Sequence, residues 1–99
     1  MEPYQEISRS VAGRCVIVTG AASGFGAAIA RRMAQAGARV VVADLQAEGA
    51  ERMADELRRE GAQAMSVKID VSSREDFEHL VTHTRQAWGG LDILVNNAG

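Results

Sequence analysis

The sequence has little cysteine, little excess charge and no long apolar run, and each shortage excludes a class of protein. Cys15 is the only cysteine among 99 residues, so no disulfide can form within the chain, which suits a reducing compartment. The formal net charge of −2 and the scattered arginines give no electrostatic reason to bind nucleic acid or an anionic membrane. The apolar runs are too short to span a bilayer, and the N-terminus carries Glu2 and Glu6 where a signal peptide would be apolar. We therefore expect a cytoplasmic protein that binds neither nucleic acid nor membrane.

Short apolar segments alternate with helical segments after a polar lead-in over residues 1–12. The apolar segments are typical of strands buried on both faces, and the third, being less apolar, is expected near a sheet edge. Such short connections favour a parallel sheet with right-handed crossovers. We predict that residues 13–99 form an α/β unit, a partial Rossmann-like doubly wound parallel sheet with βαβαβαβ connectivity and strand order 3-2-1-4. The expected strands cover residues 14–19, 39–44, 64–70 and 91–95.

Three helices are expected between these strands, each with one apolar face. The first follows a run of glycines and ends at Gly37, the second covers residues 47–61, and the third begins at a capping box on Ser72 or Ser73. The side chains expected to face the sheet are Phe25, Ala28, Ile29, Met33 and Ala36 in the first helix, Ala50, Met53, Ala54 and Leu57 in the second, and Phe77, Leu80, Val81, Thr84 and Trp88 in the third.

Gly20, Gly24 and Gly26 separate the first strand from the first helix. A helix N-terminus carries unpaired N–H groups and a partial positive charge, which suit a pyrophosphate. We expect Gly20 to permit a tight turn, Gly24 a close approach of phosphate, and Gly26 the packing of the helix on the sheet. Ser23 adds a hydroxyl donor. The alternative is a glycine loop that serves packing alone, and a triphosphatase is not expected because the Lys-Ser/Thr of a P-loop is missing.

Asp44 ends the second strand, 18 residues after Gly26. A carboxylate at this point accepts hydrogen bonds from the diol of an adenosine ribose and repels a 2′-phosphate. The next residue is Leu45, and Arg39 lies five positions back, roughly 16 Å along a strand. Neither can neutralise a 2′-phosphate, so the sequence predicts NAD(H) as cofactor. The alternative is a solvated aspartate that merely closes a strand.

Three short motifs now make the chain resemble the short-chain dehydrogenase/reductase family. Residues 19–26 read TGAASGFG and resemble its TGxxxGxG cofactor loop, and Asp70-Val71 resemble the pair that contacts adenine. Residues 96–99 read NNAG, as the family does at the end of its fourth strand. Phe25 stands where the family usually has isoleucine, but its N–H is still available to a phosphate. The resemblance covers residues 13–99 and implies an NAD-binding fold.

The resemblance also implies a set of cofactor contacts. The glycine loop would hold the pyrophosphate, Asp44 the ribose, and Asp70 with Val71 the adenine. Asn96 and the backbone of Ala98 and Gly99 would lie beside the adenosine ribose and brace the central strands. The residues predicted to contact the cofactor are Gly20, Ser23, Gly24, Phe25, Gly26, Asp44, Leu45, Asp70, Val71, Asn96, Ala98 and Gly99.

The catalytic residues implied by the resemblance are a serine and a Tyr-x-x-x-Lys pair, all well downstream of NNAG. The only tyrosine here is Tyr4, far from Lys68, so no catalytic residue is assigned and the chain alone is predicted to be inactive. We expect the NAD(H)-binding part of an oxidoreductase that moves hydride between NAD and a small alcohol or carbonyl compound, truncated after the fourth strand. The alternative is a stand-alone, non-catalytic NAD-binding or interaction module. Homo-oligomerisation is left open.

Other chemistry-bearing residues have simpler explanations. His79 and His83 are four apart and could share a metal, but they lie opposite the apolar stripe, so a solvated helix face is favoured and no metal is expected. Cys15 alternates with buried strand residues and is expected to be an inert core thiol. Ser72 and Ser73 fit helix caps better than nucleophiles, because no histidine base is evidently positioned beside them.

Overall fold

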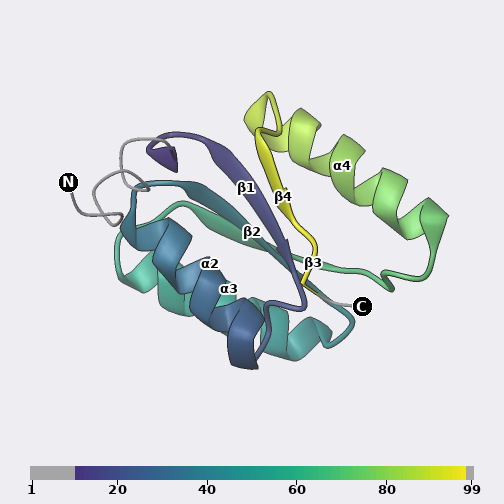
Figure 1. The fold of residues 1–99 in the computed structure, drawn as a ribbon, viewed down its shortest axis with the longest axis horizontal. Helices are drawn as coiled ribbons and strands as arrows, with labels where there is room; N and C mark the ends of the chain where they lie inside the picture. Colours follow the sequence, from purple (N-terminus) through teal and green to yellow (C-terminus); the bar gives the residue numbers. More distant parts are fainter. Residues whose placement is uncertain (1–10, 98–99) are drawn as a thin grey trace.

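The computed structural model describes residues 11–97, which form a four-stranded parallel sheet flanked by three helices (Figure 1). The strands lie in the order β3-β2-β1-β4, and every neighbouring pair is parallel. The predicted fold class and strand order are therefore confirmed. The elements are β1 (Cys15–Thr19), α2 (Gly24–Gln35), β2 (Arg39–Asp44), α3 (Ala47–Arg59), β3 (Ala64–Lys68), α4 (Arg74–Trp88) and β4 (Ile93–Val95).

The element boundaries depart from the sequence predictions at a few places. Strand β3 ends at Lys68 rather than residue 70, and β4 begins at Ile93 rather than residue 91. Asp92 still pairs with β1, since its N–H donates to the Cys15 carbonyl at 3.0 Å and its carboxylate accepts from the Cys15 N–H at 2.9 Å. Residues 1–10 of the expected lead-in lie outside the described residues. Val11 is buried, so packing begins ahead of residue 13.

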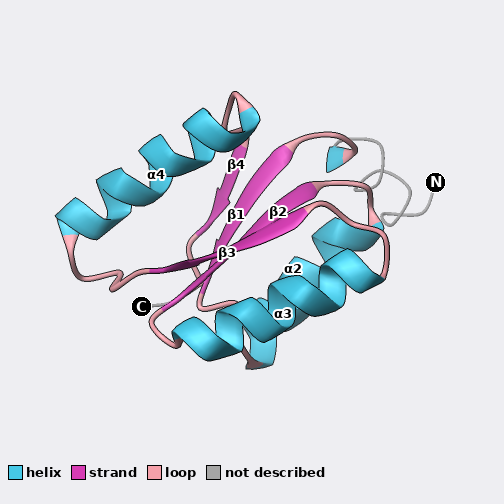
Figure 2. Ribbon diagram, turned by 180° about the vertical axis from the view of Figure 1, so that it is seen from behind, coloured by secondary structure: helices cyan, strands magenta, loops and turns pink. Residues whose placement is uncertain are grey.

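The core consists of two layers, one on each face of the sheet (Figure 2). Alternate strand residues point to opposite faces, which gives each layer its own set of side chains. Helices α2 and α3 cover one face, and α4 covers the other. The first layer includes Val16, Val18, Val40, Val42, Ala30, Met53 and Leu57, and the second includes Cys15, Ile17, Val41, Ala43, Ile69 and Leu80.

The predicted inner face of α2 is wrong at Phe25 and Ala28, whereas Ile29, Met33 and Ala36 pack against the core as predicted. Phe25 is 76% exposed and Ala28 is also exposed, whereas Gly26 and Ala30 are buried. The reason is a close contact in the first turn: a Cβ on Gly26 would lie 2.1 Å from the Gly20 carbonyl oxygen. Gly26 therefore packs too closely on Gly20 to leave room for a side chain, and its neighbour Phe25 lies on the exposed side.

The other two helices follow their predicted stripes. In α3 all four expected side chains are buried, and in α4 Leu80 and Thr84 are buried while Phe77, Val81 and Trp88 are partly buried. The structure selects Ser73 as the cap of α4, because its hydroxyl accepts from the Asp76 N–H at 3.1 Å. No helix in residues 11–97 combines the length and apolar character needed to cross a membrane.

The flank beside β4 is the least covered part of the sheet. Strand β4 pairs only with β1 in the described region, and Leu94 lies opposite Ile17 in register. Ile17 is fully buried in the α4 layer, but Leu94 is 41% exposed. Helix α4 therefore covers the middle of this face and leaves the β4 side open.

Candidate functional site

The predicted cofactor residues that the structure describes lie at one edge of the sheet, where all four parallel strands end. In Figure 1 the loop between β1 and α2 lies at the same edge as the end of β4. The register pairs Thr19 with Ala43 on one side and Val18 with Val95 on the other. The loops after β1, β2 and β4 are consequently neighbours, and the end of β3 adjoins that of β2 through the pair of Asp44 with Lys68.

The three glycines of the β1–α2 loop serve different purposes. Gly20 and Gly24 have φ angles of 65° and 61°, in the left-handed region that favours glycine. A Cβ on Gly26 would meet both the Gly20 carbonyl and, at 2.7 Å, the Asn97 amide nitrogen. A Cβ on Gly24 would meet nothing within 4 Å, so this side of the loop is open. Gly26 is explained by packing, whereas Gly24 faces free space where a ligand could approach.

The N-terminus of α2 is left without the side-chain groups that usually satisfy a helix start. Ser23 occupies the N-cap position, but its hydroxyl makes no capping hydrogen bond, and the first turn contains no acidic residue. The partial positive charge of the first N–H groups is therefore not offset by side chains of the helix itself. This arrangement fits an anionic ligand such as a diphosphate.

Asp44 lies beside this helix start and bridges two loops. One carboxylate oxygen, Oδ2, accepts from the Ala22 N–H at 3.0 Å, and the other, Oδ1, accepts from the Gln46 N–H at 2.9 Å. Leu45 follows with 57% of its surface exposed. Arg39 is directed elsewhere: it donates to the Trp88 carbonyl at 3.0 Å, and its guanidinium lies 5.6 Å from the centre of the Trp88 ring.

Thr19 and Asn97 join the site without having been predicted as site residues. Thr19 is fully buried, and its hydroxyl accepts from the Asn97 backbone N–H at 3.0 Å. The same hydroxyl donates to the side-chain amide oxygen of Asn96, Oδ1, at 3.1 Å. The Asn97 side chain in turn approaches the Gly20 carbonyl at 3.5 Å. These bonds tie the end of β4 to the glycine loop. A polar residue at the end of an otherwise apolar strand was the available signal for Thr19.

Asp70 and Val71 follow β3 at the same edge. The Asp70 carboxylate accepts from the Ser72 hydroxyl at 2.6 Å and from the Ser72 N–H at 2.9 Å. The hydroxyl bond chiefly, and the backbone bond next, hold the pKa of Asp70 below its ordinary value. Val71 packs against the α4 layer. Asn96 is exposed at the end of β4, and the predicted contacts at Ala98 and Gly99 lie outside the described residues.

The two histidines and the cysteine considered in the sequence lie outside this edge of the sheet. His79 and His83 are exposed on α4 with stacked rings 6.3 Å apart, and the described part of the chain has no group of three or more potential metal ligands. Cys15 is fully buried. Burial is the main reason that its pKa lies above the ordinary value of a thiol, and the nearby charge of Arg39 opposes this shift.

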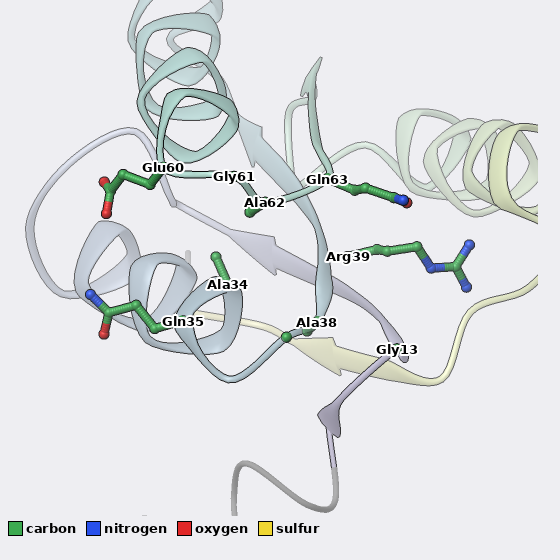
Figure 3. A pocket seen from close by; sticks show the side chains of 10 residues that line it. Gly13, Ala34, Gln35, Ala38, Arg39, Glu60, Gly61, Ala62 and Gln63 are labelled. Carbon is green, nitrogen blue, oxygen red and sulfur yellow. The ribbon is translucent and has the colours of Figure 1, made fainter.

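A hollow of about 560 Å³ lies at the opposite edge of the sheet (Figure 3). It is formed where β1 and β2 begin and where α2 and α3 end, and it shares no residue with the predicted cofactor set. Figure 3 shows the side chains of Gln35, Glu60 and Arg39 around its rim. The glycine loop, by contrast, lies at the carboxyl edge, where ligands of open α/β sheets bind.

The chain is similar to known proteins in both sequence and structure. The family model described as short chain dehydrogenase matches residues 14–99. The chain is 44% identical over 99 residues to the oxidoreductase YuxG of Bacillus subtilis, covering 98% of this chain and 14% of that protein. It is 59% identical over 83 residues to the 4-formylbenzenesulfonate dehydrogenase TsaC1/TsaC2 of Comamonas testosteroni, covering 84% of this chain and 33% of that protein.

A solved structure with the same fold is the hydroxysteroid dehydrogenase from Escherichia coli. It superposes with a TM-score of 0.89 at 39% sequence identity, and the match covers 95% of this chain and 40% of that one. The chain thus spans only a minor part of the length of the relatives it matches, and these comparisons do not support a stand-alone, non-catalytic module.

Proposed function

Because the chain belongs to the short chain dehydrogenase family, we propose that residues 13–99 form the NAD(H)-binding portion of an oxidoreductase. The whole enzyme would transfer hydride between NAD and a small alcohol or carbonyl compound. The observation that carries this proposal is the uncapped start of α2 directly beside the carboxylate of Asp44. The N–H groups of the helix start would bind the diphosphate of a dinucleotide, and the neighbouring carboxylate would accept hydrogen bonds from its ribose hydroxyls.

Each predicted residue has a role in binding or orientation. A bound nicotinamide cofactor supplies the hydride chemistry of the family. The N–H groups of Ser23, Gly24 and Phe25 would hold its diphosphate, and the lone pairs left on Asp44 would accept from the ribose hydroxyls. Leu45, with more than half of its surface exposed, would offer an apolar surface beside the adenosine.

The remaining contacts come from the ends of the outer strands. Asp70 and Val71 would line the adenine, and Asn96 with Ala98 and Gly99 would lie by the adenosine ribose. No catalytic residue is assigned to this chain. The cytoplasmic location is part of the same proposal and rests on the single cysteine.

The preference for NAD over NADP rests on charge. The Asp44 carboxylate would repel a 2′-phosphate, Leu45 follows it, and Arg39 is engaged with Trp88. One other cation lies near the glycine loop: the Arg52 guanidinium is 3.7 Å from where a Cβ of Gly49 would stand, and that position is 3.0 Å from the Ala22 Cβ. Arg52 is therefore the basic side chain to substitute if NADP binds.

The direct test is a comparison of NAD and NADP with this chain. At a concentration of about 100 times its Kd, a ligand stabilises the folded state by about 2.7 kcal/mol, which a thermal shift detects. We expect NAD to raise the midpoint temperature of unfolding and NADP to have little effect on it. NAD should also change the NMR chemical shifts mainly at residues 20–26. An equal rise in the midpoint temperature with both ligands would overturn the preference for NAD. NAD-induced NMR changes at the opposite edge, or none, would overturn the site.

A further inference from the structure

The glycine loop is held from both sides by neighbouring strands. On the β2 side, the Ala21 N–H donates to the Ala43 carbonyl at 3.3 Å, and the Ala22 N–H donates to the Asp44 carboxylate at 3.0 Å. On the β4 side, the Asn97 amide approaches the Gly20 carbonyl at 3.5 Å. The Asp44 bond is the shortest of these three and involves a charged acceptor, and such bonds are stronger than neutral ones.

The second Asp44 oxygen links the same loop to the start of α3. It accepts from the Gln46 N–H at 2.9 Å, one residue before that helix begins. The glycine loop also lies close to the first turn of α3 itself, because a Cβ on the buried Gly49 would lie 3.0 Å from the Ala22 Cβ. Asp70, the carboxylate at the end of the next strand, accepts only within its own turn, from Ser72.

From these contacts we infer a second role for Asp44: it is a positioning residue that holds the diphosphate-facing loop in shape and couples it to α3. An ionised carboxylate has about four acceptor sites, of which two are used by Ala22 and Gln46, so two remain for a ribose diol. An asparagine cannot replace it, because its NH₂ group would face one of the two backbone N–H donors.

The hydrogen bonds of Asp44 to the loop are present in the chain without ligand. Their effect on diphosphate binding rests on the proposed function. If Asp44 served the ribose alone, replacing it would leave a ligand without the diol unaffected. If Asp44 also positions the loop, its replacement weakens the grip on the diphosphate itself. Substituting Asp44 to admit NADP would then loosen the loop that binds the diphosphate of either cofactor.

The anchoring is measured first, by amide hydrogen exchange in the unliganded chain. For Asp44→Ala, which removes both acceptor oxygens, we expect exchange at Ala22 to accelerate roughly tenfold or more relative to Val41 in the middle of β2, which reports global unfolding. Asp44→Glu, which keeps the charge but moves it, should accelerate Ala22 as well. Glu48→Gln, which removes an exposed charge from the first turn of α3, should not. An unchanged ratio of Ala22 to Val41 exchange in Asp44→Ala would overturn the inference.

The consequence is then measured with ADP and 2′,3′-dideoxy-ADP, which differ only in the ribose diol. We expect Asp44→Ala to weaken the binding of both nucleotides at least several-fold relative to Glu48→Gln, which corrects for the lost charge. Weakening of ADP alone, or tighter binding of the dideoxy compound, would show a role at the ribose only and overturn the inference. If the unsubstituted chain binds neither nucleotide, the proposed function fails, and the exchange ratio alone still decides whether Asp44 anchors the loop.

Discussion

Helices α2 and α4 both begin at a serine after a strand of the same sheet, yet their first turns differ. At α4 the Ser73 hydroxyl accepts from the Asp76 N–H, and Glu75 and Asp76 place negative charge in the first turn. At α2 the Ser23 hydroxyl makes no such bond and the first turn has no acid. A helix start that satisfies itself serves the fold, whereas one left open is available to a ligand.

The largest effect is expected where the α2 start meets the sheet. Gly26→Ala would bring a Cβ within 2.1 Å of the Gly20 carbonyl oxygen, so backbone must shift. We expect a loss of about 2–3 kcal/mol in the free energy of unfolding, measured with urea. Gly90→Ala is the matched control, because a Cβ there meets nothing within 4 Å. Equal stability of both variants would contradict the close packing of the glycine loop.

The start of α2 lacks the negative charge that α4 carries in its first turn, and an aspartate at Ser23 would supply it. Ser23→Asp should cap the helix and offset its dipole, stabilising the unliganded chain by about 0.5–1 kcal/mol. The same carboxylate should lower the affinity for NAD at least tenfold, because it occupies and repels the proposed diphosphate position. Ser23→Asn is the control that caps without charge. Unchanged affinity in Ser23→Asp, measured by calorimetry, would argue that the anion binds elsewhere.

Removing the hydroxyl of each cap serine should change the free energy of unfolding by smaller and unequal amounts. Ser73→Ala removes an observed cap and should cost about 1 kcal/mol of stability. Ser23→Ala removes no capping bond and should change stability by less than about 0.5 kcal/mol. Urea unfolding of both variants tests the difference. A larger loss for Ser23→Ala than for Ser73→Ala would reverse the comparison.

The smallest effect concerns the turn that leads into α4. The pKa of Asp70 lies below its ordinary value of 3.8, chiefly because of the Ser72 hydroxyl. A depressed carboxyl pKa favours the folded state above pH 3.8, and this contribution is lost as the pH falls through the lower folded value. Ser72→Ala should raise the Asp70 pKa toward 3.8 in an NMR titration. Ser73→Ala should leave it where it is, since Ser73 bonds to Asp76 instead.

The strands could be predicted because they depend on signals close together in sequence, and their order followed from the dinucleotide-binding fold that such an alternation indicates. Apolar runs and short connections marked all four strands, and the strong stripe of α3 fixed which side of that helix is buried. In the alanine-rich α2 the apolar contrast is weak, so the pattern did not show that Gly26 is buried against Gly20 while Phe25 is exposed.

The individual hydrogen bonds that hold the loops of the site together could not be predicted, because they join residues far apart in the sequence. The bond from Asn97 to Thr19 joins residues 78 apart, and no local pattern encodes it. The direction of the Asp44 carboxylate toward Ala22 depends in the same way on how two loops meet across the sheet. The identity of Asp44 was readable from the sequence, but its hydrogen-bond partners were not.

Trp88 is the single tryptophan of the chain, and it sits at the end of α4 with the Arg39 guanidinium over its ring. Intrinsic fluorescence therefore reports on one side of the sandwich, while far-ultraviolet circular dichroism averages over all three helices. If both signals melt together, the two layers unfold as one cooperative unit. A fluorescence transition at lower temperature would mean that α4 detaches first, while the sheet and the two helices on its other face stay folded.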